Sequence, residues 1–326
     1  MAGHTDTRHV EHQIKVLAPA EGVYELIADV THWPRVFPPT VHIEHEQLSE
    51  SEERIRLWAT ANGAVKTWTS RRRLDAGARR VEFRQEISQP PVAAMGGTWI
   101  VEPIAASECA VRLLHDYRAV EGTAENLEWI DRAVDRNSTA ELGALKSTAE
   151  LGSDRTDLML AFEDTVQIAG SARDVYEFIY DATQWVHRLP HVARVSLQED
   201  TPNIQLLDMD TQAPNGSVHT TTSVRICFPE NKIIYKQIVL PALMSVHTGC
   251  WLLEENAQGV AVTSQHTIVI KPSAVAAVLG AEATVADARN FVRTALSTNS
   301  LATLDHARSF AEHRSRERVP RAEQGS

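Results

Sequence analysis

The chain has 326 residues, about twice the length of a common single domain, which predicts two domains or one large one. Hydrophobic residues make up 43% of it and charged residues 23%, which excludes a wholly disordered chain. The net charge of −11 disfavours proteins that bind nucleic acid or an anionic membrane surface, because both need clustered positive charge. Three scattered cysteines predict neither a disulfide framework nor a zinc site, and they favour a reducing cytoplasmic location. The N-terminus lacks the apolar core of a signal peptide, and the apolar run at 274–279 is too short to span a membrane.

The first half of the sequence is echoed in the second half. Residues 23–38 are VYELIADVTHWPRVFP and residues 175–190 are VYEFIYDATQWVHRLP, identical at eight of sixteen positions with an offset of 152. The same offset relates two later pairs of segments: 80–85 to 232–237, and 97–99 to 249–251. A period near 150 residues is too long for a solenoid repeat and is typical of a duplicated domain.

Each half contains the same predicted elements in the same order. An alternating strand comes first, at 10–17 and 160–168, followed by a short helix that a proline or serine opens, at 19–29 and 171–181. A helical turn carrying a tryptophan comes next. About six alternating segments separated by turn residues then predict a meandering antiparallel sheet. Long amphipathic helices at 124–150 and 283–313 end the two halves.

These elements predict an α+β fold class with two tandem domains, at 8–150 and 158–313. In each domain a curved antiparallel sheet wraps around the long C-terminal helix and leaves an internal cavity, the kind of space that holds a small apolar ligand. We expect a short polar linker at 151–157 and a polar, frayed tail at 314–326.

Strand alternation predicts which polar side chains face the cavities. Trp68, Ser70 and Arg72 share one face of a strand, and His115 and Tyr117 share the inner face of another. The alternatives are a surface arginine with a buried stem and a core histidine that binds a backbone carbonyl.

The second half offers the counterparts Arg225 and His266. His266 lies among inward apolar residues, which strengthens a functional interpretation of both histidines. The face of Arg225 is ambiguous, because Val224 and Ile226 compete for the interior. Five further residues are predicted to line the pockets, with a role in core packing as the alternative for the tryptophans: Gln85, Trp99, Tyr235, Gln237 and Trp251.

Motifs for other chemistries are missing from the sequence. It contains no GxSxG, no P-loop and no GxGxxG. The pair His42 and His45 lacks the HExxH order and lies on a predicted strand. We therefore expect no metal site, no nucleotide site and no cofactor.

The predicted plan resembles a known family. The WP..FP segment at 33–38, the WTSRR strand at 68–72, the HDY strand at 115–117 and the duplication together resemble the two-domain aromatase/cyclases of bacterial type II polyketide synthases. This family belongs to the START-like, or Bet v 1-like, helix-grip superfamily. The resemblance covers both predicted domains.

The resemblance implies an activity and partners. Family members fold a poly-β-ketone chain delivered by an acyl carrier protein, promote aldol closure of the first ring and dehydrate it to an aromatic ring. The two-domain type implies a chain already reduced by a ketoreductase and C7–C12 closure, in association with other synthase subunits. Single-domain relatives can carry a tyrosine after the WP..F segment, where this chain has Thr40 and Val192.

The resemblance carries the SRR arginine over to Arg72, and the chemistry of ring closure and dehydration gives a hypothesis for the roles of the site residues. Arg72, from the SRR motif, would polarise a ketone or enolate oxygen, and His115, titrating near neutrality, would transfer protons. Arg225 and His266 would do the same in the second cavity. The sequence leaves open whether both cavities are catalytic. The alternatives are a non-catalytic tandem carrier of a lipid or aromatic molecule, and a structural partner within a synthase complex. Candidate residues for docking the carrier protein are basic: Arg71, Arg73, Arg79 and Arg80.

Overall fold

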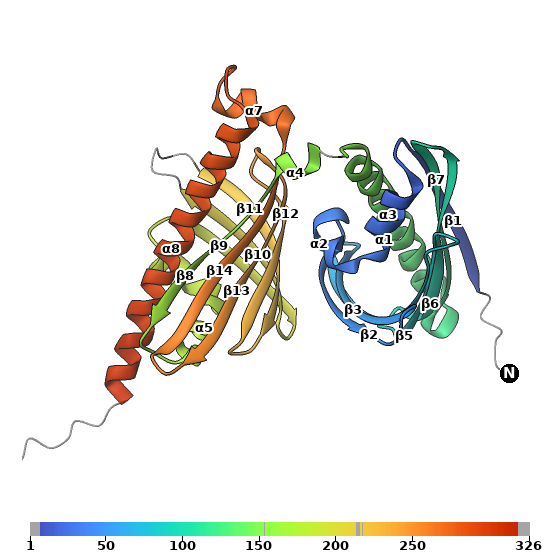
Figure 1. Ribbon diagram of the computed structural model, residues 1–326. Helices are drawn as coiled ribbons and strands as arrows, with labels where there is room; N and C mark the ends of the chain where they lie inside the picture. Colours follow the sequence, from blue (N-terminus) through green and yellow to red (C-terminus); the bar gives the residue numbers. More distant parts are fainter. Residues whose placement is uncertain (1–6, 153, 213–215, 217, 319–326) are drawn as a thin grey trace, which may run out of the picture. The chain divides into compact units, whose positions relative to one another are not determined.

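A computed structural model describes residues 7–152, 154–212, 216 and 218–318 (Figure 1). The chain divides into two compact units between Arg155 and Thr156. Each unit contains one seven-stranded antiparallel sheet and one long C-terminal helix, which confirms the predicted fold class. None of the helices in the described ranges combines the length and the apolar character that crossing a bilayer requires.

The first unit contains one curved sheet around helix α3 (Figure 1). Its strands occur in the order β1-β7-β6-β5-β4-β3-β2, so that each strand from β2 to β6 pairs with the next one in the chain and β7 pairs with β1. The strands are β1 (Arg8–Val16), β2 (Thr40–Gln47), β3 (Glu52–Ala61), β4 (Ala64–Asp75), β5 (Arg80–Ile87), β6 (Val92–Ala105) and β7 (Glu108–Ala119). The helices are α1 (Ala20–Ala28), η1 (Val30–His32), α2 (Trp33–Val36), η2 (Val120–Gly122) and α3 (Ala124–Glu150).

The second unit repeats this topology in the order β8-β14-β13-β12-β11-β10-β9. Its strands are β8 (Met159–Ile168), β9 (Val192–Thr201), β10 (Ile204–Gln212), β11 (Val218–Phe228), β12 (Lys232–Val239), β13 (Met244–Asn256) and β14 (Gly259–Ile270). Its helices are α5 (Ala172–Tyr180), η3 (Ala182–Gln184), α6 (Trp185–Arg188), α7 (Pro272–Leu279) and α8 (Val285–Arg318).

Local sequence explains where the main helices begin and which face they bury. The side chain of Thr123 accepts a hydrogen bond from the backbone N–H of Asn126 at the start of α3, and Ser171 caps α5 in the same way. Five apolar side chains of α3 recur at helical spacing and are buried beneath the sheet: Ile130, Ala133, Val134, Leu142 and Leu145.

The structure corrects two boundaries near the ends of the second unit. The predicted linker contains a short helix, α4 (Asp154–Leu158), whose Leu158 is buried. Helix α8 continues to Arg318, five residues into the predicted polar tail. Arg314 and Arg318 form ion pairs with the buried carboxylate of Asp174, which gives those five residues a reason to stay helical. The rest of the predicted tail, 319–326, lies outside the described residues.

Candidate functional site

A mostly apolar cavity lies between the sheet of the first unit and α3. It contains about 1090 Å³ of empty space, including its opening to solvent. Six of the predicted site residues line it: Trp68, Ser70, Arg72, Gln85, Trp99 and His115. Tyr117 does not line it, although it faces inward as predicted. Its hydroxyl donates to Asp131 of α3, and its ring packs beside Ile130 in a small core cluster.

One row of paired strand residues connects the predicted histidine to the predicted arginine. In the first unit His115 of β7 pairs with Gly97, Gly97 with Phe83, and Phe83 with Arg72 of β4. The second unit repeats this row residue for residue: His266, Gly249, Tyr235 and Arg225. The two rows therefore place corresponding side chains at matching points of the two sheets.

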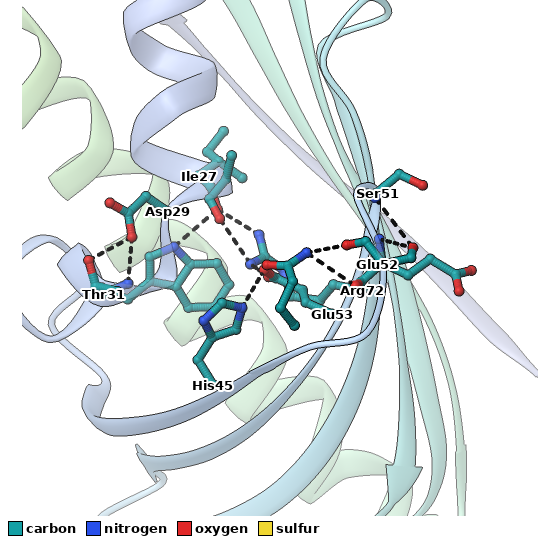
Figure 2. Close-up of polar contacts among 12 residues, drawn as sticks. Ile27, Asp29, Thr31, His45, Ser51, Glu52, Glu53 and Arg72 are labelled. Carbon is teal, nitrogen blue, oxygen red and sulfur yellow. Dashed lines mark hydrogen bonds and ion pairs between the residues drawn. The ribbon is translucent and has the colours of Figure 1, made fainter.

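Arg72 is fully buried and holds the end of α1 (Figure 2). It donates hydrogen bonds to the carbonyl oxygens of Ile27 at 2.7 Å and Ala28 at 3.2 Å, and it forms an ion pair with Glu53. Its guanidinium carbon lies 4.8 Å from the centre of the Trp33 ring. Burial lowers the pKa of Arg72, an effect that Glu53 opposes, and a guanidinium remains charged under these conditions.

Most donors of Arg72 are thus used for structure, because the last carbonyls of a helix need partners. The exception is Nε, which is buried with no partner among the described residues while the side chain lines the cavity. His45 adds a further contact to this cluster, since its Nε2 lies 2.8 Å from Glu53 (Figure 2).

Arg225 makes the same helix-end and tryptophan contacts in the second unit, which resolves its ambiguous face. It is buried and donates to the carbonyl oxygens of Ile179 at 2.5 Å and Tyr180 at 3.3 Å, at the end of α5. Its guanidinium carbon lies 5.3 Å from the centre of the Trp185 ring. Burial lowers its pKa as well. The sequence predicted an inward Arg72 and left the face of Arg225 open, and it did not indicate that both arginines bind the end of a helix.

His115 faces the cavity as a neutral imidazole. Its Nδ1 is buried without a hydrogen-bond partner in the described part of the chain, and Phe83 contacts its ring edge-on with 5.5 Å between ring centres. Burial in this apolar wall and, as a smaller cause, the nearby His12 lower its pKa to about 4. The expectation of a histidine that titrates near neutrality is therefore wrong, because desolvation penalises the charged form.

His266 lies in a closed polar network instead. Its Nδ1 is 3.0 Å from the hydroxyl of Tyr235 and 3.0 Å from Nε2 of His247. Its Nε2 is 3.0 Å from the hydroxyl of Ser264 and 2.9 Å from that of Ser300 on α8. Burial lowers the pKa of His266 to about 4 and that of His247 to about 3. Both ring nitrogens of His266 are thus occupied by protein groups.

The other predicted pocket residues of the second unit differ in their surroundings. Tyr235 belongs to the network around His266. Trp251 packs in the apolar core with Ile179. The carbonyl oxygen of the Gln237 side chain is buried without a partner among the described residues, whereas that of Gln85 accepts a hydrogen bond from Ser88 at 2.7 Å.

Several cavity residues escaped the sequence analysis. The inner face of α3 contributes Trp129, Asn137 and Ser138, and the β5–β6 connection contributes Gln89. Gln89 accepts a hydrogen bond from the backbone N–H of Thr67 at 3.1 Å, which ties this connection to β4. The helical periodicity of α3 and the repeated Asn-Ser pair could have indicated the helix residues, but the approach of the β5–β6 connection is a tertiary feature.

Three of the four candidate docking arginines form ion pairs within the first unit. Arg71 pairs with Glu52 at 2.5 Å, Arg79 with Glu21 at 3.1 Å and Arg80 with Glu82 at 3.0 Å. Arg73 is exposed. These pairs leave little unpaired positive charge at the predicted docking residues. Across the described ranges, no cluster of three histidine, cysteine or acidic side chains is placed to bind a metal ion.

Comparison with known proteins yields consistent similarities. Residues 7–150 match the family model for polyketide cyclase/dehydrase and lipid transport. The chain is 47% identical to the granaticin polyketide synthase bifunctional cyclase/dehydratase of Streptomyces virginiae, covering 91% of this chain and 97% of that protein. It is 44% identical to the actinorhodin polyketide synthase bifunctional cyclase/dehydratase of Streptomyces coelicolor, covering 93% and 96%. It also resembles the crystal structure of the di-domain ARO/CYC BexL from the BE-7585A biosynthetic pathway, with 56% identity, a TM-score of 0.83 and coverage of 94% and 99%.

Replacing Arg72 by alanine is expected to lower the free energy of unfolding of the first unit. The change leaves Glu53 buried without its guanidinium and two helix-end carbonyls without donors, a loss of about 3–5 kcal/mol in the free energy of unfolding. Urea unfolding of Arg72→Ala measures this loss. The double variant Arg72→Met, Glu53→Leu removes both charges and should recover part of it. Wild-type stability for Arg72→Ala would contradict the helix-capping role.

The buried histidines of the second unit predict a loss of stability in mild acid. Their folded pKa values lie below the unfolded value of about 6.5, so below pH 6.5 the unfolded chain binds protons that the folded unit does not. The free energy of unfolding should then fall by up to about 1.4 kcal/mol per pH unit and histidine as the pH approaches 4. Urea unfolding at pH 7.5, 6.5 and 5.5 tests this. His247→Met, which copies Met95 of the first unit, should flatten the dependence, and an unchanged slope would argue against it.

Proposed function

This chain belongs to the polyketide synthase bifunctional cyclase/dehydratases, and we propose that it performs the first-ring reaction in the cavity of its first unit. The substrate would be a carrier-bound poly-β-ketone already reduced at one carbonyl. The protein would fold it, promote C7–C12 aldol closure and dehydrate the product to an aromatic ring. The observation that carries this assignment is His115, a neutral imidazole with an unpartnered Nδ1 in an apolar cavity.

The apolar wall suits the ring-closure step. A CH₂ group between two ketones is already acidic, so the protein has mainly to fold the chain and stabilise an enolate oxygen. A neutral imidazole can take the carbon-bound proton, and the permanent charge of Arg72 stabilises the enolate. Arg72 has Nε left for a substrate oxygen, because its other two nitrogens bind Glu53 and the end of α1.

The low pKa of His115 suits the second proton transfer of the dehydration step, in which the imidazolium gives its proton to the leaving hydroxyl. The histidine takes a proton from the carbon next to the aldol alcohol, and the C–O bond breaks as the C=C bond forms. The same proton then leaves with the departing hydroxyl as water, so that atoms and charge balance. An imidazolium with a pKa of about 4 is a stronger acid than an exposed histidine and gives up its proton readily.

The second unit supports this assignment by contrast. The sequence suggested an equal catalytic role for His266 and Arg225, yet both ring nitrogens of His266 bind protein side chains. A substrate would have to displace those side chains before it could exchange a proton with His266. We therefore assign the chemistry to the first unit and a stabilising role to the network of the second.

The partners of this reaction follow from the same proposal. The carrier protein that delivers the chain would present it at the open end of the first cavity, and the other synthase subunits would supply the chain. The ion pairs of Arg71, Arg79 and Arg80 make them weak candidates for docking an acidic carrier, which leaves Arg73 among the predicted four.

Alanine variants of the two matched histidines test the assignment. In a reconstituted minimal synthase with ketoreductase, His115→Ala should lower formation of the aromatic first ring at least 100-fold, because general acid–base catalysis contributes about that much. His266→Ala should lower the free energy of unfolding and leave the rate within about threefold. Both proteins must be shown to be folded by circular dichroism. Unchanged aromatic product with His115→Ala would favour the carrier hypothesis, and equal losses in both variants would make both units catalytic.

A further inference from the structure

The two units place an aromatic ring at the same point beside the histidine. Phe83 and Tyr235 each lie over the glycine of their row, since a Cβ on Gly97 would come within 2.6 Å of Cζ of Phe83 and one on Gly249 within 2.3 Å of Cζ of Tyr235. Both rings meet their histidine at a steep angle, 68° in the first unit and 72° in the second. The hydroxyl of Tyr235 lies beside the histidine of the second unit. The corresponding position in the first unit holds no oxygen from the residues that the structure describes, because Phe83 lacks the hydroxyl.

Strand pairing shows that Phe83 and Tyr235 form one of three pairs of corresponding residues around the histidine in which the first unit has an apolar side chain and the second a polar one. His247 occupies the position in the second unit that Met95 occupies in the first. His247 pairs with Ile268, two residues after His266, and Met95 pairs with Tyr117, two residues after His115. Ser264 likewise occupies the position of Leu113, because they pair with Trp251 and Trp99. Three polar partners of His266 thus correspond to apolar side chains that line the cavity of the first unit: Phe83, Met95 and Leu113.

We propose that Phe83 is a positioning residue that keeps Nδ1 of His115 free for a substrate oxygen. This oxygen binds where the Tyr235 hydroxyl lies in the second unit, about one hydrogen-bond length from Nδ1, as the 3.0 Å contact there indicates. The group is one that carries an exchangeable proton, the aldol hydroxyl or an enol. The inference rests on the proposed function, and it identifies where in the cavity the reacting oxygen binds.

Burial energetics explain why the substrate would choose this position. A buried ring nitrogen without a hydrogen bond carries a desolvation penalty, and the substrate's oxygen removes it on binding. Phe83, Met95 and Leu113 offer no competing donor or acceptor. The cavity is therefore selective for a chain that brings an oxygen to this point, and a purely apolar molecule of the same size would leave Nδ1 unpaired.

A single added oxygen tests the proposal. The new hydroxyl in Phe83→Tyr should bind Nδ1 of His115 and lower the rate of aromatic product formation at least tenfold. Circular dichroism should show an unchanged fold. Phe291→Tyr on the exposed face of α8 makes the same chemical change outside any site and should keep the wild-type rate. The ¹⁵N ring shifts of His115 provide a second readout, because the new tyrosine hydroxyl in Phe83→Tyr should fix the ring proton of His115 on Nε2.

Met95→His, which copies His247 at a half-buried position, gives the same information if Phe83→Tyr does not fold. The new imidazole should also bind Nδ1 of His115 and lower the rate of aromatic product formation at least tenfold. The inference is overturned if either folded variant shows the new hydrogen bond in the ¹⁵N shifts yet keeps the wild-type rate, or loses activity without that bond. The proposed function fails separately, if His115→Ala itself remains active.

Discussion

In each unit a buried arginine ties the middle of the sheet to the end of the first helix. Arg72 and Arg225 occupy matching points, donate to the last carbonyls of α1 and α5, and lie over the tryptophan that follows. A guanidinium has fixed donor directions, so these bonds set the distance and angle between helix and strand. In the first unit this contact forms part of the cavity wall, because Trp33 and Arg72 both line it.

Duplication then supplied two copies of one framework with different interiors. The paired rows keep the histidine, the glycine and the arginine, while the aromatic residue between them is Phe83 in one copy and Tyr235 in the other. Hydrogen bonds satisfy His266 from within the protein, so its network adds specific, buried contacts to the core. The first copy leaves His115 among apolar side chains and an empty volume. The same framework thus surrounds a histidine bonded to protein groups in the second unit, and a histidine with an unpartnered nitrogen beside a cavity in the first.

The sequence predicted much of this arrangement from alternation and repetition. Parity placed Arg72 and His115 on inner faces, and helical spacing gave the bounds of α3. The sequence-based prediction failed where the hydrogen-bond or ion-pair partner of a side chain comes from a distant segment. Tyr117 faces inward but binds Asp131 of α3 instead of lining the cavity, and Arg314 and Arg318 extend α8 because Asp174 lies beside them. Periodicity along a strand or helix carries no information about such partners.

The sequence by itself determined the duplication, the order of elements in each half, the family and the inward residue types. The duplication, the element order and the inward residue types follow from local periodicity and from the offset of 152 residues. The family follows from the resemblance carried by the WP..FP, WTSRR and HDY segments and the duplication. Only the tertiary structure decided which histidine is free, which arginine donors remain and that both histidines are neutral. Those properties depend on desolvation and on hydrogen bonds between strands and helices far apart in the sequence. The same residue types therefore acquire different chemistry in the two halves.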